Sequence, residues 1–199
     1  MTRTGARTAL IACGAVAQDT ATLVRMHGWD ADVHGISSEL HMTPRDIGPA
    51  VEEKLQALLP DYERVVVVYG DCGTGGRLDE VLARYPAVRP AGAHCFEWYA
   101  GELFRRFAEE PGIYFLTDWL VQNWERAVIK GLGIDRYPWM AERYFGNLER
   151  VLFVRQHPDA EREEKARAIA AFMGKPLEIH DLGIRPLEEL LTPLMEGAD

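Results

Sequence analysis

The sequence predicts an α/β fold: an open, mostly parallel sheet of about five to seven strands, with helices on both faces in a Rossmann-like three-layer arrangement. Two observations predict this class. Short apolar runs alternate with longer amphipathic segments along the chain, as in successive β-α-β units. Four consecutive valines at 65–68 indicate a strand that is buried on both faces, at the centre of a parallel sheet. The glycines that follow, through Gly76, indicate a tight turn out of that strand.

Each expected strand is a short apolar run bounded by glycine, proline or polar residues. These runs are residues 8–14, 31–36, 65–68, 88–93, 112–117, 150–154 and 177–181. Pro90 interrupts one run and makes it the weakest strand.

Each expected helix has apolar residues at helical spacing, or a cap or stop signal at one end. The helices are expected at residues 18–27, 45–59, 78–85, 96–109, 118–130, 159–173 and 186–195. Asp19 or Thr20 is expected near the cap of the first of them, and a helical insertion is expected around residues 134–149.

Composition limits the class of protein. The 199 residues, 47% hydrophobic and 27% charged, fit a single α/β domain over residues 1–199. The formal net charge of -9 disfavours nucleic acid and anionic membranes as partners. No run of about 18 apolar residues predicts a membrane span. The apolar run at 9–17 lacks a clear cleavage site, so we expect no export signal, a cytoplasmic location and reduced cysteines.

The three cysteines, Cys13, Cys72 and Cys95, all follow apolar runs that are expected to be strands. Carboxyl ends of neighbouring parallel strands lie roughly 5–10 Å apart, at the edge where open α/β sheets bind ligands. Thiolates select soft metals, so this arrangement predicts a zinc or iron–sulfur site with the three cysteines as ligands. His41 follows the second strand and is a candidate fourth ligand, with His94, water or substrate as alternatives. The plainer interpretation is that each cysteine is a small buried hydrophobic residue.

Two other interpretations concern the glycine-rich loop. Cys72 is a candidate catalytic residue, because a helix N-terminus would lower its pKa and His94 would serve as base. Gly73, Thr74 and Gly75 are candidate cofactor-binding residues, because such a loop can hold an anion at a helix start. The loop matches neither a P-loop nor a dinucleotide-binding pattern, and the neighbouring Asp71 argues against phosphate there.

The cysteine-bearing loops and one strand end form an ordered set. The set is Cys13, Leu40-His41 with Pro44, Tyr69-Gly-Asp-Cys-Gly73, His94-Cys95 with Gly101, and Tyr114-Phe-Leu-Thr-Asp-Trp119. It resembles the domain-of-unknown-function family numbered 1638, over roughly residues 9–153. Many members carry an Asp between the His and the Cys of the fourth feature. The resemblance therefore supports Cys95 as a ligand, but not His94.

The resemblance implies no established activity. Members are often encoded beside corrinoid-dependent methyltransferases, their corrinoid proteins and reductive activators, which implies partners of that kind. One hypothesis is a metal–thiolate protein in corrinoid or one-carbon methyl transfer, acting on a small molecule or thiol. A second is a metal-free reactive-cysteine enzyme. A third is a non-catalytic partner or chaperone of a corrinoid methyltransferase system, with an aromatic docking surface comprising Trp124, Tyr137, Trp139, Tyr144 and Phe145. An acidic domain rich in aromatic residues is also of the kind that forms homodimers.

Overall fold

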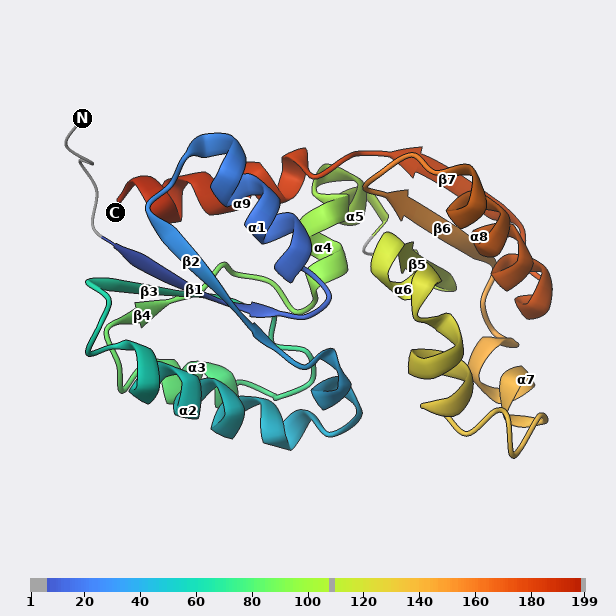
Figure 1. Ribbon diagram of the computed structural model, residues 1–199. Helices are drawn as coiled ribbons and strands as arrows, with labels where there is room; N and C mark the ends of the chain where they lie inside the picture. Colours follow the sequence, from blue (N-terminus) through green and yellow to red (C-terminus); the bar gives the residue numbers. More distant parts are fainter. Residues whose placement is uncertain (1–6, 108–109, 198–199) are drawn as a thin grey trace. The chain divides into compact units, whose positions relative to one another are not determined.

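The computed structural model describes residues 7–107 and 110–197, which divide into two compact units (Figure 1). Unit 1 takes the described residues of Met1–Cys95 and Glu188–Asp199, and unit 2 those of Phe96–Leu187. Each unit has an all-parallel sheet, one of four strands and one of three, so the predicted α/β class is confirmed. The strands are divided between two sheets, whereas the sequence suggested one. A single domain over residues 1–199 stays a prediction.

The sheet of unit 1 is built around the valine strand. Its strands, in spatial order, are β2 (Ala31–Ile36), β1 (Thr8–Cys13), β3 (Arg64–Val68) and β4 (Ala87–Val88). Thr8 pairs with Ala31 on one side and Arg64 on the other. All of β1 and the four valines of β3 are buried, as expected of central strands. The β4 strand has only two residues, because Pro90 lacks the N–H that a longer ladder needs.

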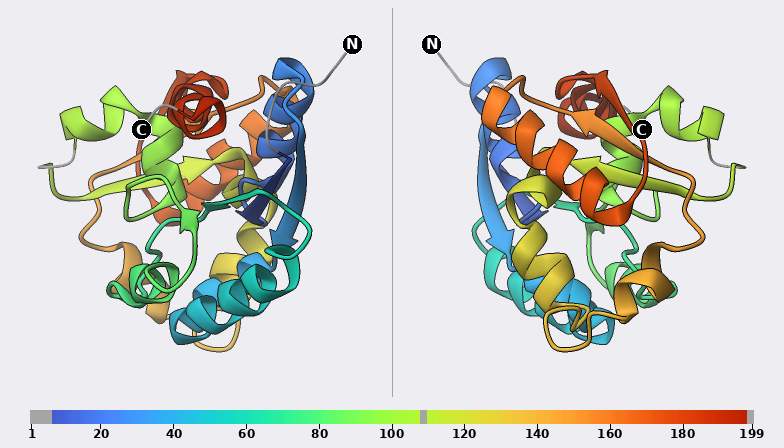
Figure 2. Two further views of the ribbon diagram at one scale, coloured as in Figure 1. Left: turned by 90° about the vertical axis from the view of Figure 1, so that its left-hand side faces the viewer. Right: turned by 90° about the vertical axis from the view of Figure 1, so that its right-hand side faces the viewer.

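Helices cover both faces of this sheet. They are α1 (Ala17–His27), α2 (Ile47–Leu58), α3 (Arg77–Leu82) and α9 (Arg185–Glu196), with the short 3₁₀ helices η1 (Ser38–Met42) and η2 (Pro44–Asp46) after β2. α1 and the part of α9 in unit 1 lie on one face, and α2 and α3 on the other (Figures 1 and 2). His27 Nε2 lies 2.6 Å from Glu188 Oε1 and joins the first pair. The α1 helix begins after Val16 with Asp19 in its first turn, and the Thr20 hydroxyl donates to the Val16 carbonyl.

The helix expected at 96–109 is divided into α4 (Cys95–Ala100) and α5 (Glu102–Phe107). Gly101 lies between them with φ +52°, a left-handed conformation that interrupts a helix and favours glycine. A Cβ atom there would also lie 3.3 Å from the Pro186 side chain. Residues 108 and 109 of the expected helix lie outside the described residues.

The sheet of unit 2 has the order β5 (Ile113–Thr117), β6 (Arg150–Arg155) and β7 (Leu177–Asp181). Its helical segments are α6 (Asp118–Gln122), the π-helix η3 (Glu125–Lys130), α7 (Met140–Phe145) and α8 (Ala160–Met173). The expected helix at 118–130 is therefore divided near Asn123, whose side-chain amide donates to the Trp119 carbonyl at 2.8 Å. Thr117 caps α6 and Asp159 caps α8. The α7 helix lies in the expected insertion.

The aromatic residues of unit 2 belong to two groups. Trp124 and Phe145 are buried in the core and contact Tyr114, with ring centroids 5.9–6.0 Å apart. Tyr137, Trp139 and Tyr144 are 52%, 64% and 42% exposed. The expectation of one five-residue aromatic surface was wrong for the two buried members. None of the helices in residues 7–107 and 110–197 is long and apolar enough to cross a bilayer.

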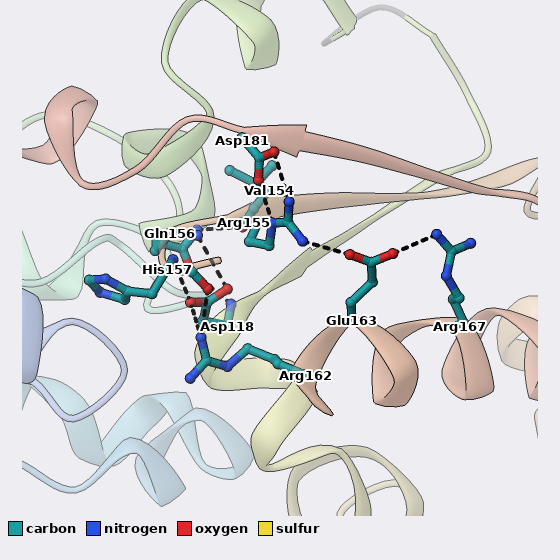
Figure 3. Close-up of polar contacts among 9 residues, drawn as sticks. All are labelled: Asp118, Val154, Arg155, Gln156, His157, Arg162, Glu163, Arg167 and Asp181. Atoms are coloured by element: carbon teal, nitrogen blue, oxygen red, sulfur yellow. Dashed lines mark hydrogen bonds and ion pairs between the residues drawn. The ribbon is translucent and has the colours of Figure 1, made fainter. Parts of the chain in front are cut away.

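A buried polar network joins the carboxyl ends of β5 and β6 (Figure 3). The Asp118 carboxylate accepts hydrogen bonds from the backbone N–H groups of Gln156 and His157 and from Arg162, at 2.7–3.2 Å. The Gln156 side chain accepts from the Asp118 N–H at 2.7 Å in return. Burial raises the pKa of Asp118, while these partners act in the opposite direction. The mutual pairing of these groups indicates a structural clamp in unit 2.

Candidate functional site

The carboxyl ends of all four strands of unit 1 carry the residues singled out from the sequence. Cys13 ends β1, and Cys72 lies in the loop after β3. Cys95 follows β4 and begins α4, while His41 lies in η1 after β2. Because β1, β3 and β4 are parallel neighbours, the three thiols come from adjacent strand ends. The chain passes from β1 to β2 on one side and returns to β3 on the other, which is the switch point where open α/β sheets bind ligands.

Gly70 brings the loop after β3 against the segment before Cys95. A Cβ atom at Gly70 would lie 3.0 Å from the Ala93 carbonyl oxygen and 3.1 Å from His94 Cα, both backbone atoms. The Cys72 N–H donates to the same Ala93 carbonyl at 2.7 Å, and the Asp71 N–H donates to the Gly92 carbonyl at 3.2 Å. The absence of a side chain at Gly70 therefore allows the Cys72 and Cys95 segments to approach each other.

Cys72 has a strained backbone. Its φ of +49° makes it the only residue other than glycine with positive φ among residues 7–107 and 110–197. A side-chain-bearing residue pays about 1–3 kcal/mol for such a conformation, which persists where the surroundings hold it. The hydrogen bond to Ala93 and the flanking Gly73 hold it here. Strain of this kind concentrates at functional sites, so Cys72 is the residue of this loop with the strongest claim to a functional role.

Asp71 occupies the donors of the glycine-rich loop. Its carboxylate accepts from the Thr74 hydroxyl and from the backbone N–H groups of Gly75 at 3.1 Å and Gly76 at 2.9 Å. The hydrogen bond from Thr74, with help from the two glycine N–H groups, lowers the pKa of Asp71. Cofactor binding by Gly73, Thr74 and Gly75 stays a prediction, but two donors that an anion would need already bind this carboxylate.

Tyr69, directly after β3, places an unpartnered hydroxyl among the thiols. The residue is 0% exposed, and its hydroxyl has no hydrogen-bond partner in the described part of the chain. Burial, followed by the nearby thiols of Cys13, Cys72 and Cys95, raises the pKa of Tyr69. Ala12 of β1 pairs with Val68 of β3, so Cys13 and Tyr69 follow paired residues of neighbouring strands, although no hydrogen bond joins the two side chains. Leaving a buried hydroxyl unpaired costs about 1–3 kcal/mol.

Two of the three thiols are buried, and both receive backbone donors. Cys13 and Cys72 are 1% and 7% exposed, Cys95 is partly buried, and none of the three forms a disulfide. Burial raises the pKa of Cys13, and it raises the pKa of Cys72 to about 12, with further contributions from Cys13 and Asp71. The Ala15 N–H donates to Cys13 Sγ at 3.5 Å, and backbone hydrogen bonds at Cys95 and Gly70 lower the pKa of Cys72. Such donors favour the thiolate, and hydrogen bonds to sulfur are one way proteins tune metal–thiolate sites.

His41 has a defined tautomer. Its Nδ1 lies 2.7 Å from the Ser38 carbonyl oxygen, which can only accept, so Nδ1 carries the proton. Burial, with a contribution from His94, lowers the pKa of His41 and favours the neutral ring, whose Nε2 then has a lone pair. The ring stacks on Tyr69 with centroids 5.7 Å apart. Metal-binding histidines commonly donate their other N–H to a backbone carbonyl in this way.

The donor set suits a soft metal, although the geometry is not that of a formed metal centre. In residues 7–107 and 110–197, no group of three or more His, Cys, Asp or Glu side chains is spaced to hold a metal ion. The side chains that gather here are thiols and a neutral imidazole, the ligands that zinc and iron–sulfur clusters use. Asp71, the adjacent carboxylate, is bonded to its own loop.

Sequence reasoning missed three residues that build the site. Tyr69 and Gly70 were noted only as parts of the glycine-rich stretch, although an aromatic residue directly after four valines is a signal of a buried strand end. Arg89 gives no sequence signal. Its guanidinium donates to the carbonyls of Pro90 at 3.0 Å and Gly92 at 3.3 Å and binds Asp79, which fixes the segment that leads to Cys95.

These features define a parallel α/β protein with a cysteine-rich site at a sheet switch point. The chain belongs to the family described as "Protein of unknown function (DUF1638)", whose model matches residues 36–191. The resemblance seen in the sequence is thus confirmed, although the matched range begins and ends later than residues 9–153. His41, Cys72 and Cys95 lie inside this range, and Cys13 lies outside it. No curated protein and no solved structure matches the chain.

Proposed function

We propose that unit 1 carries a soft-metal site in which Cys13, Cys72 and Cys95 bind zinc as thiolates. The observation that carries the proposal is that the three cysteines follow the adjacent parallel strands β1, β3 and β4 at one sheet edge, where the buried Tyr69 hydroxyl has no partner among the described residues. Their strands are far apart in the chain and adjacent in the sheet, so only the fold gathers them. An iron–sulfur cluster held by the same thiols is the alternative metal group.

The burial of the Cys72 thiol favours metal binding over a metal-free reactive cysteine. A metal-free nucleophile needs a pKa near or below neutral, whereas the pKa of Cys72 is raised to about 12. A bound cation would lower the pKa of Cys72 instead, because a coordinating thiol is deprotonated outright. The N–H donors at Cys13 and Cys72 would then serve thiolates. The metal-free cysteine enzyme, with Cys72 as nucleophile, is therefore the less supported hypothesis.

We further propose that the site serves corrinoid or one-carbon methyl transfer in the cytoplasm, where cysteines stay reduced. This part of the proposal rests on the family resemblance, which implies partners encoded beside corrinoid methyltransferases. A zinc with an open position can bind a substrate thiol as its thiolate, the form that accepts a methyl group. A corrinoid protein or methyltransferase would be the partner.

A second candidate function is that of a non-catalytic partner or chaperone of such a system. The exposed aromatic residues Tyr137, Trp139 and Tyr144 of unit 2 favour it, because aromatic side chains are enriched at protein interfaces. A chain that binds no metal but co-purifies with a corrinoid protein, and loses it in Trp139→Ala, would support this candidate.

Metal analysis of anaerobically purified protein tests the main proposal. Wild type should contain one zinc per chain, and Cys72→Ser and Cys95→Ser should lose it. Val66→Thr is a matched control, because it also places a hydroxyl in buried β3 but outside the thiol group. Iron with sulfide would assign the cluster instead. Metal-free wild type of intact fold, even after incubation with zinc or iron and sulfide, contradicts the proposal.

The fourth ligand is tested by His41→Ala, with His34→Ala as its control. His34 lies in the same unit, but its Nε2 is bonded to the Tyr62 hydroxyl at 3.1 Å. Loss of zinc in His41→Ala alone would identify Nε2 of His41 as a ligand. Full zinc content in both variants would assign the fourth position to substrate or water.

A further inference from the structure

We infer that Tyr69 is a positioning residue of the thiol site, whose hydroxyl donates a hydrogen bond to the Cys13 sulfur when that sulfur is a metal-bound thiolate. The inference rests on the proposed metal site and adds to it a residue outside the expected ligand set.

The Tyr69 hydroxyl lacks an acceptor among the described residues. The side chain is 0% exposed, and its hydroxyl is the only buried side-chain nitrogen or oxygen without a partner in residues 7–107 and 110–197. Buried polar groups are nearly always hydrogen-bonded, so an exception in a folded chain calls for a reason. A ligand that the free protein does not contain is such a reason.

Strand register points to Cys13 as the acceptor. Ala12 of β1 pairs with Val68 of β3, so Cys13 and Tyr69 directly follow paired residues of neighbouring strands, and Cys13 already accepts the Ala15 N–H at 3.5 Å. A thiol sulfur is a weak acceptor, whereas hydrogen bonds to ionised groups are shorter and stronger. Metal binding therefore supplies the acceptor that the hydroxyl lacks, and a small approach of the two groups completes the hydrogen bond.

The Tyr69 ring is held in place independently of its hydroxyl. The Tyr69 N–H donates to the Val67 carbonyl at 3.0 Å, and the ring stacks on His41. Tyr69→Phe keeps both contacts and removes only the hydroxyl, so it isolates the proposed role. Tyr62→Phe is the matched control, because the Tyr62 hydroxyl is bonded to Asp32 at 2.8 Å, away from the thiols.

The test compares the metal-free and metal-loaded forms of wild type, Tyr69→Phe and Tyr62→Phe. Metal-free Tyr69→Phe should be at least as resistant to urea as wild type, because it removes an unpaired buried hydroxyl. Its zinc dissociation constant, measured by competition with a chelator, should rise by about 10-fold or more, as for other groups that support ligands. With Co(II) as probe, its sulfur-to-metal charge-transfer band should move to lower energy, because the sulfur loses a donor. Tyr62→Phe should keep the wild-type affinity and band.

Each result has a separate meaning. Unchanged zinc affinity and band in Tyr69→Phe, with wild type binding normally, overturn the role of Tyr69 and leave the metal site standing. Reduced stability of the metal-free variant with unchanged affinity would assign Tyr69 a purely structural role. Failure of wild type to bind zinc, Co(II) or an iron–sulfur cluster overturns the metal site and this inference together.

Discussion

Gly70→Ala is the substitution that separates the two cysteine loops most directly. The added methyl group would lie 3.0 Å from the Ala93 carbonyl oxygen, 3.1 Å from His94 Cα and 3.2 Å from the Ala93 carbonyl carbon. Favourable contacts between carbon atoms lie at about 3.5–4.0 Å, so the backbone at 93–94 must move by several tenths of an ångström. No flexible side chain can yield instead, because all three atoms belong to the backbone.

The cost follows from the groups that move. Overpacking of a close contact costs about 1–3 kcal/mol. The hydrogen bonds that Cys72 and Asp71 donate to the 92–93 segment would lengthen, and each contributes about 0.5–1.5 kcal/mol. The lower entropy of an unfolded chain with alanine offsets about 0.4–1 kcal/mol. We expect a net loss of about 2 kcal/mol in the free energy of unfolding, together with weaker zinc binding.

The assay is urea denaturation followed by circular dichroism, with zinc competition on the same samples. Gly35→Ala is the control, because a Cβ there meets nothing within 4 Å, and the residue lies in β2 of the same unit. It should match wild type or gain up to about 1 kcal/mol. A Gly70→Ala variant with wild-type stability and zinc affinity would refute the argument that close approach of these loops builds the site.

Two further predictions concern the loop carboxylate and the core of unit 2. Asp71→Asn should lose about 1–3 kcal/mol at pH 7, because two backbone donors and Thr74 lose their charged acceptor. The folded pKa of Asp71 is lowered, so its contribution is fully present above about pH 4 and disappears as pH falls through the folded pKa. The difference in urea stability between the two proteins should therefore shrink as pH is lowered from 7 to 3, and a constant difference would contradict the assignment. Phe145→Ala should lose about 3–5 kcal/mol by cavity formation, whereas exposed Trp139→Ala should stay within about 0.5 kcal/mol. Equal thermal stability of these two variants would contradict the division between core and surface.

The sequence predicted the strands well because burial on both faces leaves a local mark. The valines of β3 and the apolar run of β1 can hardly form anything but central strands. Longer helices were predicted less well where a single residue interrupts them. Gly101 divides one helix through positive φ, a conformation that helical periodicity does not reveal. The division into two sheets depends on strand pairing, which no local pattern encodes.

The candidate site was predictable as a set of strand ends but not as a cluster. Each cysteine follows an apolar run, and the carboxyl ends of parallel strands lie at the same sheet edge. The sequence therefore located all three cysteines at that edge. Their proximity depends on the order of β1, β3 and β4, and on the close approach at Gly70, which are tertiary features. The importance of Tyr69 also emerged only in three dimensions, because an unpaired hydroxyl is defined by what surrounds it.

The central claim is that three thiolates bind one ion, and anaerobic titration of the metal-free protein with Co(II) tests it most directly. Sulfur-to-Co(II) charge-transfer absorption grows with the number of bound thiolates, and soft thiolate sites accept this ion in place of zinc. We predict that wild type saturates at one Co(II) per chain. In each cysteine variant that still binds the ion, the charge-transfer absorption should be lower by about a third; the variants are Cys13→Ser, Cys72→Ser and Cys95→Ser. Absence of a charge-transfer band in wild type, or a band unchanged in all three variants, would contradict the claim.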